Sequence, residues 1–301
     1  LHMRHTHLPE HKFVSGQPET GAEIANDLER ICENFGGENI AACIVEPVAG
    51  STGCLVPPKG YLEKLREICD KHGILLIFDE VITGWGRMGS VFASQEFGVV
   101  PDIMTMAKAT TNGVVPMGVV ACKDEMYDAV MDAAPMGAVE LFHGYTYSGI
   151  PVSVAAALAV QDIFEKEDVF SHVKEISTYF QQQLKTLEQI PLVGEVRGVG
   201  FMAAVEASMQ VSNGNDRLEK DYAVGELVDI HCQQLGLLGR PLINLCIISP
   251  PLVIIEAQVD ELVSILKKGL ELTLADLREQ GIWQDTELSH NTSNAKRALS
   301  S

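Results

Sequence analysis

Basic residues are scarce in this sequence of 301 residues. It carries 22 Lys and Arg side chains against 41 Asp and Glu side chains, which gives a formal net charge of −19 at pH 7. Nucleic acids and anionic membrane surfaces attract proteins mainly through Lys and Arg. The charge balance therefore argues against both as partners, although it says little about a small substrate, because a local site can oppose the net charge.

Long apolar runs and cysteine motifs are also lacking. No apolar stretch reaches the roughly 20 residues that a transmembrane helix needs, and no signal peptide is recognisable. The seven cysteines show no C-x-x-C spacing, and most lie in apolar runs. This pattern is typical of reduced, buried thiols, so we expect a cytoplasmic protein.

The composition is that of a globular chain, since 46% of the residues are hydrophobic and 21% are charged. The length suits one large domain or two ordinary ones, and no internal repeat is visible. Apolar periodicity, glycines and prolines place the expected elements. The predicted helices are 21–35, 60–72, 93–97, 152–163, 169–189, 221–235 and 257–279, and the predicted strands are 40–45, 74–78, 103–107, 117–122, 193–197, 200–205, 237–239 and 245–248.

Three apolar runs each end in a charged residue, and they are the most informative feature of the chain. The runs lead into Glu46, Asp79 and Lys108. Continuous runs of this kind are typical of parallel strands buried on both faces, with ligands bound at the carboxyl ends of the strands. We therefore expect two acids and one lysine to converge at one crevice.

An acid and a lysine at neighbouring strand ends suggest pyridoxal phosphate chemistry. In such enzymes a lysine forms a Schiff base with the cofactor, and an acid pairs with the pyridine nitrogen. The bare pattern also fits another α/β enzyme that uses Lys108 alone, but Asp79 would then have no evident role.

The motifs around these residues resemble those of class III aminotransferases, the pyridoxal-phosphate enzymes of fold type I. The interval from Asp79 to Lys108 (108 − 79 = 29 positions) is similar to the spacing in that family. The resemblance covers roughly residues 10–283 and is closest to the ω-amino acid–pyruvate, or β-alanine–pyruvate, branch. The matching stretches are 45–53 (VEPVAGSTG), 78–87 (FDEVITGWGR), 101–104 (PDIM), 56–61 (VPPKGY) and 111–113 (TNG).

This resemblance implies an α/β fold with a mainly parallel large-domain sheet, helices around it, and a smaller C-terminal α+β domain. We expect residues 1–165 to form part of the large cofactor-binding domain. Residues 166–283 would then form the small domain with its connecting helix, and residues 284–301 a disordered tail.

The resemblance also assigns roles to residues at the strand ends. Lys108 corresponds to the lysine bonded to the cofactor, Asp79 to the acid that keeps the pyridine nitrogen protonated, and Val81 to the residue packed on the ring. A buried strand end would desolvate the lysine and lower its pKa, as a nucleophilic amine requires. The structural alternatives are a surface lysine, a turn-capping aspartate and ordinary core packing.

Four further residues correspond to binding positions of the family. Glu46 would arrange polar partners near the site, Thr146 and Tyr147 belong to a loop that binds the cofactor across a dimer, and Arg240 would bind a substrate carboxylate. A structural salt bridge, a helix N-cap and an ordinary surface arginine are the respective alternatives for Glu46, Thr146 and Arg240.

The sequence departs from the family in its first 40 residues. The phosphate-binding glycines and the aromatic residue that stacks on the pyridine ring are not recognisable there, so the chain looks N-terminally truncated. Ile150 stands where the branch usually has histidine, and residues 241–244 replace a Gly-Asp turn. Both differences bear on substrate preference.

The resemblance therefore implies transfer of an amino group from an ω-amino acid or amine to pyruvate, which gives alanine. The expected cofactor is pyridoxal 5'-phosphate, no metal is expected, and a homodimer or higher homo-oligomer is implied. The alternatives are an aminomutase, a transaminase for another donor such as taurine or a diamine, and a non-catalytic truncated homologue.

Overall fold

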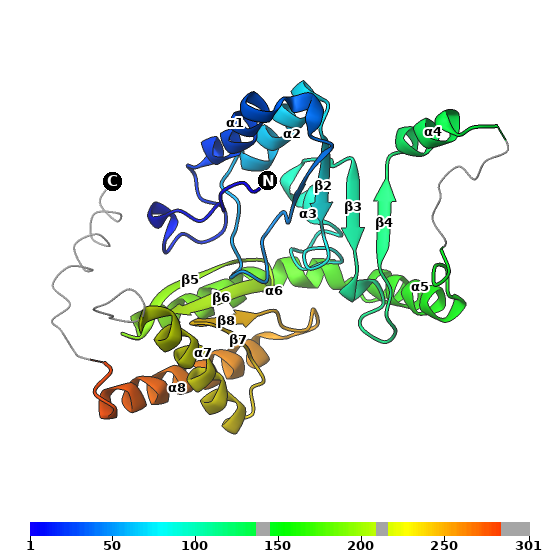
Figure 1. The fold of residues 1–301 in the computed structure, drawn as a ribbon. Helices are drawn as coiled ribbons and strands as arrows, with labels where there is room; N and C mark the ends of the chain where they lie inside the picture. Colours follow the sequence, from blue (N-terminus) through cyan, green and yellow to red (C-terminus); the bar gives the residue numbers. More distant parts are fainter. Residues whose placement is uncertain (137–144, 209–215, 284–301) are drawn as a thin grey trace.

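Two four-stranded sheets organise the chain. A computed structural model describes residues 1–136, 145–208 and 216–283 (Figure 1). The first sheet has the order β1-β2-β3-β4 and the second the order β5-β6-β8-β7. The strands are β1 (Ala42–Val45), β2 (Leu75–Asp79), β3 (Ile103–Met106), β4 (Val119–Cys122), β5 (Val193–Val199), β6 (Met202–Ala207), β7 (Arg240–Leu242) and β8 (Leu245–Ile248). The helices are α1 (Asn26–Phe35), α2 (Tyr61–His72), α3 (Ala93–Phe97), α4 (Asp124–Ala133), α5 (Pro151–Lys166), α6 (Val169–Lys185), α7 (Asp216–Gln234) and α8 (Glu256–Glu279).

The first sheet confirms the predicted parallel arrangement. β1 and β2 pair in parallel, as do β2 and β3, whereas β4 pairs with β3 in the antiparallel direction. Between β1 and β2 runs α2, which buries one apolar face that includes Leu62 and Leu65. Its end is set by Gly73 at φ 67° and ψ 29°, a left-handed conformation that glycine adopts without steric cost.

One expectation about this sheet is wrong. The continuous apolar runs predicted strands buried on both faces, but Ile44 of β1 is 62% exposed and Leu75 of β2 is 37% exposed. The alternate side chains, such as Leu76 and Phe78, pack under α1 and α2 and are fully buried. In the described part of the chain, helices cover only that face of β1 and β2.

Most predicted elements are present, with two clear differences. The segment before residue 137 contains α4, for which the sequence analysis predicted no element, and none of the residues of this helix is buried. The strand expected at 237–239 begins three residues later, at Arg240. The tail expected at 284–301 lies outside the described residues.

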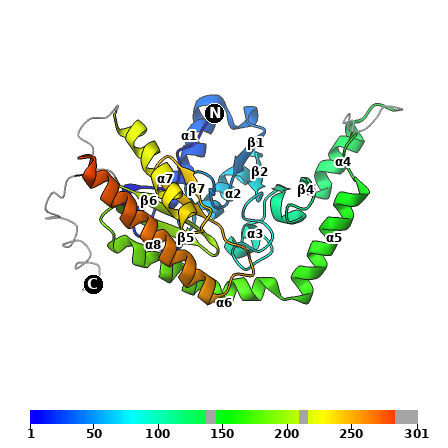
Figure 2. The ribbon, with the colours of Figure 1, turned by 90° about the horizontal axis from the view of Figure 1, so that it is seen from below.

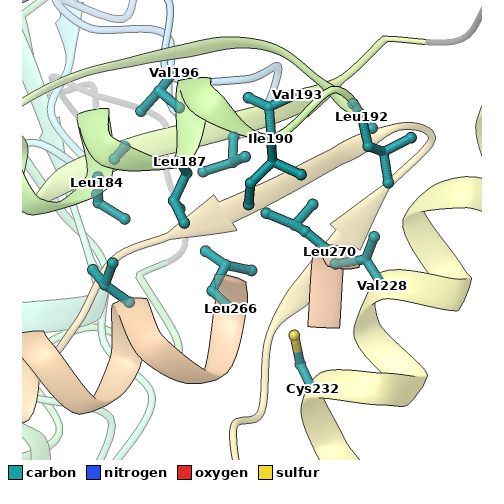
Figure 3. Packing of buried hydrophobic residues seen from close by; sticks show 14 of the residues in the cluster. Leu184, Leu187, Ile190, Leu192, Val193, Val196, Val228, Cys232, Leu266 and Leu270 are labelled. Atoms are coloured by element: carbon teal, nitrogen blue, oxygen red, sulfur yellow. The ribbon is translucent and has the colours of Figure 1, made fainter. Parts of the chain in front are cut away.

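The second sheet is antiparallel throughout and carries the main apolar core. Helices α6, α7 and α8 pack on one of its faces, where Leu184 and Leu187 meet Leu266 and Leu270 (Figure 3). Phe180 and Phe201 add an edge-to-face contact with ring centroids 5.4 Å apart. This core fixes the position of the strands that carry Arg197 and Arg240.

The other face of the second sheet packs against the loops that follow β1 and β2. Met202 and Leu245 form a buried cluster with Val48, Cys54 and other residues of these loops. The β5–β6 hairpin also touches the 84–89 loop, since the Phe201 amide donates to the Arg87 carbonyl at 2.7 Å.

Gly200, at φ 57°, permits this close approach of the hairpin. A Cβ atom at that position would lie 2.4 Å from the Arg87 carbonyl oxygen. The two sheets are therefore held together by backbone contact as well as by apolar packing.

Helices α4 and α5 project away from the second sheet (Figure 2). Val152 and Leu158 of α5 are 65% and 63% exposed, and Val120 of β4 is 70% exposed. This arm thus presents apolar side chains to solvent. None of the helices in the described residues is long and apolar enough to cross a membrane.

Truncation of Leu184 tests the core of the second sheet. Leu184 is 0% exposed, so Leu184→Ala removes packed atoms and leaves a cavity; we expect a loss of about 2–5 kcal/mol. Leu235→Ala, at a position 40% exposed, should cost less than about 1 kcal/mol. Urea unfolding measures both. Equal losses would contradict the described packing.

Candidate active site

Lys108 lies two residues beyond the end of β3 and lines a cavity of about 690 Å³. Its φ of 44° is unusual for a residue with a side chain, and the short helix Lys108–Thr110 holds it there. The Thr110 amide and hydroxyl both donate to the Ala107 carbonyl at 2.9 Å, and Trp85 Nε1 donates to Thr110 Oγ1 at 2.9 Å. Lys108 is an exposed residue, whereas the sequence analysis expected a lysine at a buried strand end.

Asp79 ends the neighbouring strand, beside β3. Its Cα pairs in register with Thr105, three residues before Lys108, so the acid and the lysine leave the same edge of the sheet. Asp79 Oδ1 accepts a hydrogen bond from the Val81 amide at 3.0 Å. This bond fixes the carboxylate and turns the chain away from β2, but neither Asp79 nor Val81 is among the residues that line the cavity.

Glu80, which sequence reasoning did not single out, holds the loop that follows Asp79. Its side chain is fully buried and accepts hydrogen bonds from the Thr83 hydroxyl at 2.5 Å and from the amides of Ala93 and Ser94 at 2.9 and 2.8 Å. It therefore fastens the start of α3 to the end of β2. Glu80 belongs to the 78–87 motif, and this is the sequence signal that could have identified it.

Arg240 brings the second sheet to the same cavity. It begins β7, its side chain is exposed, and its guanidinium donates to Ser51 Oγ at 3.5 Å. Arg87 also lines the cavity; it is mostly buried, donates to the Pro250 carbonyl, and has its pKa lowered by burial. Within the described part of the chain, one amine and two guanidinium groups thus line the cavity together with one carboxylate, that of Asp229. Because the three basic groups outnumber the acid, the cavity suits an anion.

The remaining predicted site residues lie outside this cavity. Glu46 lines a second cavity of about 1070 Å³ and accepts a hydrogen bond from the Gly50 amide at 3.0 Å. Thr146 and Tyr147 are exposed in the turn before α5, where the Ser148 amide donates to the Tyr145 carbonyl. In the described residues, therefore, only Lys108 and Arg240 of the predicted set share the first cavity.

Asp102 anchors the strand that leads to Lys108. It is 8% exposed and accepts hydrogen bonds from Arg66 at 2.8 Å, Lys123 at 2.7 Å and the Leu76 amide at 2.8 Å. Burial raises the pKa of its carboxyl, but these donors outweigh burial and leave the pKa below its ordinary value of 3.8.

Known proteins are similar to this chain in sequence and define its family. The family model for class-III aminotransferases matches residues 2–270, so the chain belongs to that family. It is 45% identical over 270 residues to the ω-aminotransferase of Caulobacter vibrioides, covering 89% of this chain and 60% of that protein. It is 47% identical over 207 residues to the β-alanine–pyruvate aminotransferase of Pseudomonas aeruginosa, covering 68% of this chain and 46% of that protein.

The fold comparison agrees. The structure of an amine transaminase from an uncultivated Pseudomonas species, in its pyridoxal-phosphate-bound form, superposes with a TM-score of 0.77 at 38% identity; the match covers 84% of this chain and 56% of that one. The chain therefore has the transaminase fold of type I, and the cofactor of its family is pyridoxal 5'-phosphate. It spans 60% or less of the length of each relative named here.

The residues present fit that cofactor. The cavity offers an accessible primary amine, an acid stands at the adjacent strand end, and the volume is within the usual range for a cofactor pocket. The basic lining suits a phosphate or a carboxylate. The amine, the acid and the basic groups all belong to this chain.

Substitution of Asp102 should weaken the fold in a pH-dependent way. Because the folded-state pKa is lowered, the carboxylate stabilises the fold above pH 3.8, and this contribution is lost as the pH falls through the folded-state pKa. We expect Asp102→Asn to cost roughly 1.5–3 kcal/mol at pH 7 and progressively less toward about pH 3. Urea unfolding across this range measures the difference.

Asp70→Asn is the matched control, because Asp70 also pairs with Arg66, at 2.7 Å, but is 65% exposed. It should cost less than about 1 kcal/mol at any pH. A pH-independent loss for Asp102→Asn would show that the ionised carboxylate is not the stabilising species.

Proposed function

We propose that this protein is a pyridoxal-phosphate-dependent transaminase that moves an amino group from an ω-amino acid or a simple amine to pyruvate, giving alanine. The observation that supports this most directly is the cavity shared by Lys108 and Arg240, with Asp79 at the adjacent strand end. The relatives named above are ω-aminotransferases and β-alanine–pyruvate aminotransferases, which favours the same reaction.

In this proposal the cofactor supplies an electron sink for the carbon that exchanges the amino group. Lys108 would hold the cofactor through its amine and would serve as the general base and acid that moves a proton during the exchange. Asp79 would pair with the pyridine nitrogen, and Val81 would pack against the ring. Arg240 binds the carboxylate of pyruvate through its planar fork of donors.

The other predicted residues take supporting roles in the proposal. Glu46 orders the turn that begins at Gly50, through the hydrogen bond to its amide. Thr146 and Tyr147 precede α5, and backbone amides at a helix start favour a phosphate. We propose that these two residues serve the site of a second subunit.

We further propose that residues 1–165 form the cofactor-binding domain, that residues 166–283 form the small domain, and that the protein is cytoplasmic. A homodimer is part of the same proposal. The exposed apolar side chains of the α4–α5 arm, such as Val152 and Leu158, support an interface there, because apolar surface of this kind often marks a contact between chains.

Covalent trapping tests the proposed site. When the protein is incubated with pyridoxal phosphate and reduced with borohydride, mass spectrometry should find one phosphopyridoxyl adduct, at Lys108. Lys108→Ala should abolish the adduct, whereas Lys59→Ala, which removes a lysine paired with Glu19, should leave it unchanged. Labelling spread over several lysines, or retained in Lys108→Ala, would overturn the proposed function.

The proposed dimer has its own test. Light scattering should give about twice the chain mass of 32.7 kDa. Leu158→Glu places a charge on the apolar arm and should yield the single-chain mass, because an unpaired buried charge is costly. Leu235→Glu, at another exposed leucine, should stay dimeric. A Leu158→Glu protein with unchanged mass would contradict an interface at α5.

A further inference from the structure

A tight turn at residues 50–54 separates the two cavities. Ala49 and Leu55 exchange two backbone hydrogen bonds, of 3.1 and 2.9 Å, and the Cys54 amide donates to the Gly50 carbonyl at 3.0 Å. Gly50, Ser51 and Cys54 line the cavity that contains Lys108. Thr52 lines the larger second cavity. The turn therefore borders both cavities, and its contacts with the rest of the fold bear on the position of its lining residues.

Arg197 of β5 holds this turn. Its Nε donates to the Gly53 carbonyl at 2.7 Å, and a terminal nitrogen of its guanidinium donates to Glu195 at 2.7 Å and Glu206 at 2.6 Å. The residue is 5% exposed. A buried guanidinium with two carboxylate partners has little freedom to move, so the Gly53 carbonyl is held by a donor that is itself fixed.

The charges around Arg197 come from three segments. Glu195 and Glu206 lie on β5 and β6, and His7 of the N-terminal segment approaches Glu195 to 3.0 Å. Burial raises the pKa of Glu195, but the hydrogen bond from His7 and the charge of Arg197 outweigh it and leave the pKa below its ordinary value. Glu195 therefore stays ionised and keeps the guanidinium in place at neutral pH.

Gly53 is shaped for this contact. Its φ of 123° is a conformation that residues with a side chain rarely adopt, and a Cβ atom there would lie 2.7 Å from an Arg197 nitrogen. Lysine could not replace the arginine, because one ammonium group cannot reproduce donors that point both to a carbonyl and to two carboxylates. The contact thus requires both residue types.

The turn at residues 50–54 also contacts Arg240. Ser51, two residues before Gly53, accepts the hydrogen bond from the Arg240 guanidinium at 3.5 Å, and Arg240 is otherwise exposed. We propose that Arg197 is a positioning residue for substrate binding: by fixing the Gly53 carbonyl, it places Ser51, and thereby Arg240, for the carboxylate of a keto acid. This inference rests on the proposed function and adds a determinant that lies outside the cavity.

The variants Arg197→Lys and Gly53→Ala break the contact from opposite sides. Arg66→Lys is the matched control, because Arg66 also binds two carboxylates, Asp102 at 2.8 Å and Asp70 at 2.7 Å, but is not a lining residue of either cavity. Hydrogen exchange followed by mass spectrometry reports on the amides of residues 49–55. Steady-state kinetics reports KM for pyruvate separately from kcat.

We expect the amides of residues 49–55 to exchange roughly tenfold faster or more in both variants, as loss of one charge-assisted hydrogen bond implies. KM for pyruvate should rise by about the same factor, while kcat at saturating pyruvate changes less than about twofold. Arg66→Lys should leave both quantities unchanged, even if its melting temperature falls. A merely structural role for Arg197 would lower the melting temperature without moving KM.

The outcomes separate this inference from the proposed function. Faster exchange with an unchanged KM would overturn the inference, as would unchanged exchange in both variants; if Arg197→Lys fails to fold, Gly53→Ala decides alone. If the wild-type chain does not transaminate, the proposed function is wrong, and calorimetric titration with pyruvate then replaces KM. Weaker pyruvate binding in the variants would still support the inference, whereas no binding by the wild type would overturn it.

Discussion

The contact between the second sheet and the loops after β1 and β2 is the interaction on which the site depends. Lys108 comes from the first sheet and Arg240 from the second, so the cavity exists only while the two sheets stay packed. Met202 and Leu245 bury apolar surface against Val48, and Gly200 lets the backbone of the β5–β6 hairpin approach Arg87. Apolar burial supplies the attraction, and the close backbone contact fixes the relative position of the sheets.

Charge is distributed unevenly around this contact. The chain as a whole is strongly acidic, yet Lys108, Arg87 and Arg240 gather at one cavity. Two buried acids outside the cavity, Asp102 and Glu195, form ion pairs with basic side chains. Among the described residues that line the cavity, Asp229 is the one acid, so three basic groups face a single carboxylate. The site can therefore attract a carboxylate or phosphate in a protein that repels anions on average.

Sequence patterns predicted the strand ends well. The runs before Glu46, Asp79 and Lys108 became parallel neighbours, as is usual for successive strands joined by a helical crossover. The motifs around these residues, together with the spacing from Asp79 to Lys108, led to the correct family. The roles of these residues stay predictions, as do those of Val81, Thr146 and Tyr147, since no comparison tests individual positions.

Contacts between distant segments could not be read from the sequence. Arg197 lies 144 positions from Gly53, and no local pattern indicates that pairing. The predicted burial of Ile44 failed for a related reason, because an apolar run shows what a strand can bury but not which elements cover it. Helix α4 was missed although Met126, Tyr127, Val130 and Met131 recur at helical spacing, so the apolar pattern that indicates a helix was present in the sequence.

The conformation of Lys108 links the scaffold to the chemistry. A left-handed backbone costs free energy for a residue with a side chain, so the fold must hold it there. The hydrogen bonds from Thr110 to the Ala107 carbonyl, and from Trp85 to Thr110, supply that restraint. Trp85 belongs to the loop that the buried Glu80 fastens to α3. The residue after Asp79 thus helps to hold the turn of Lys108, and this explains why acid, loop and lysine form one structural unit although 29 positions (108 − 79) separate the acid from the lysine.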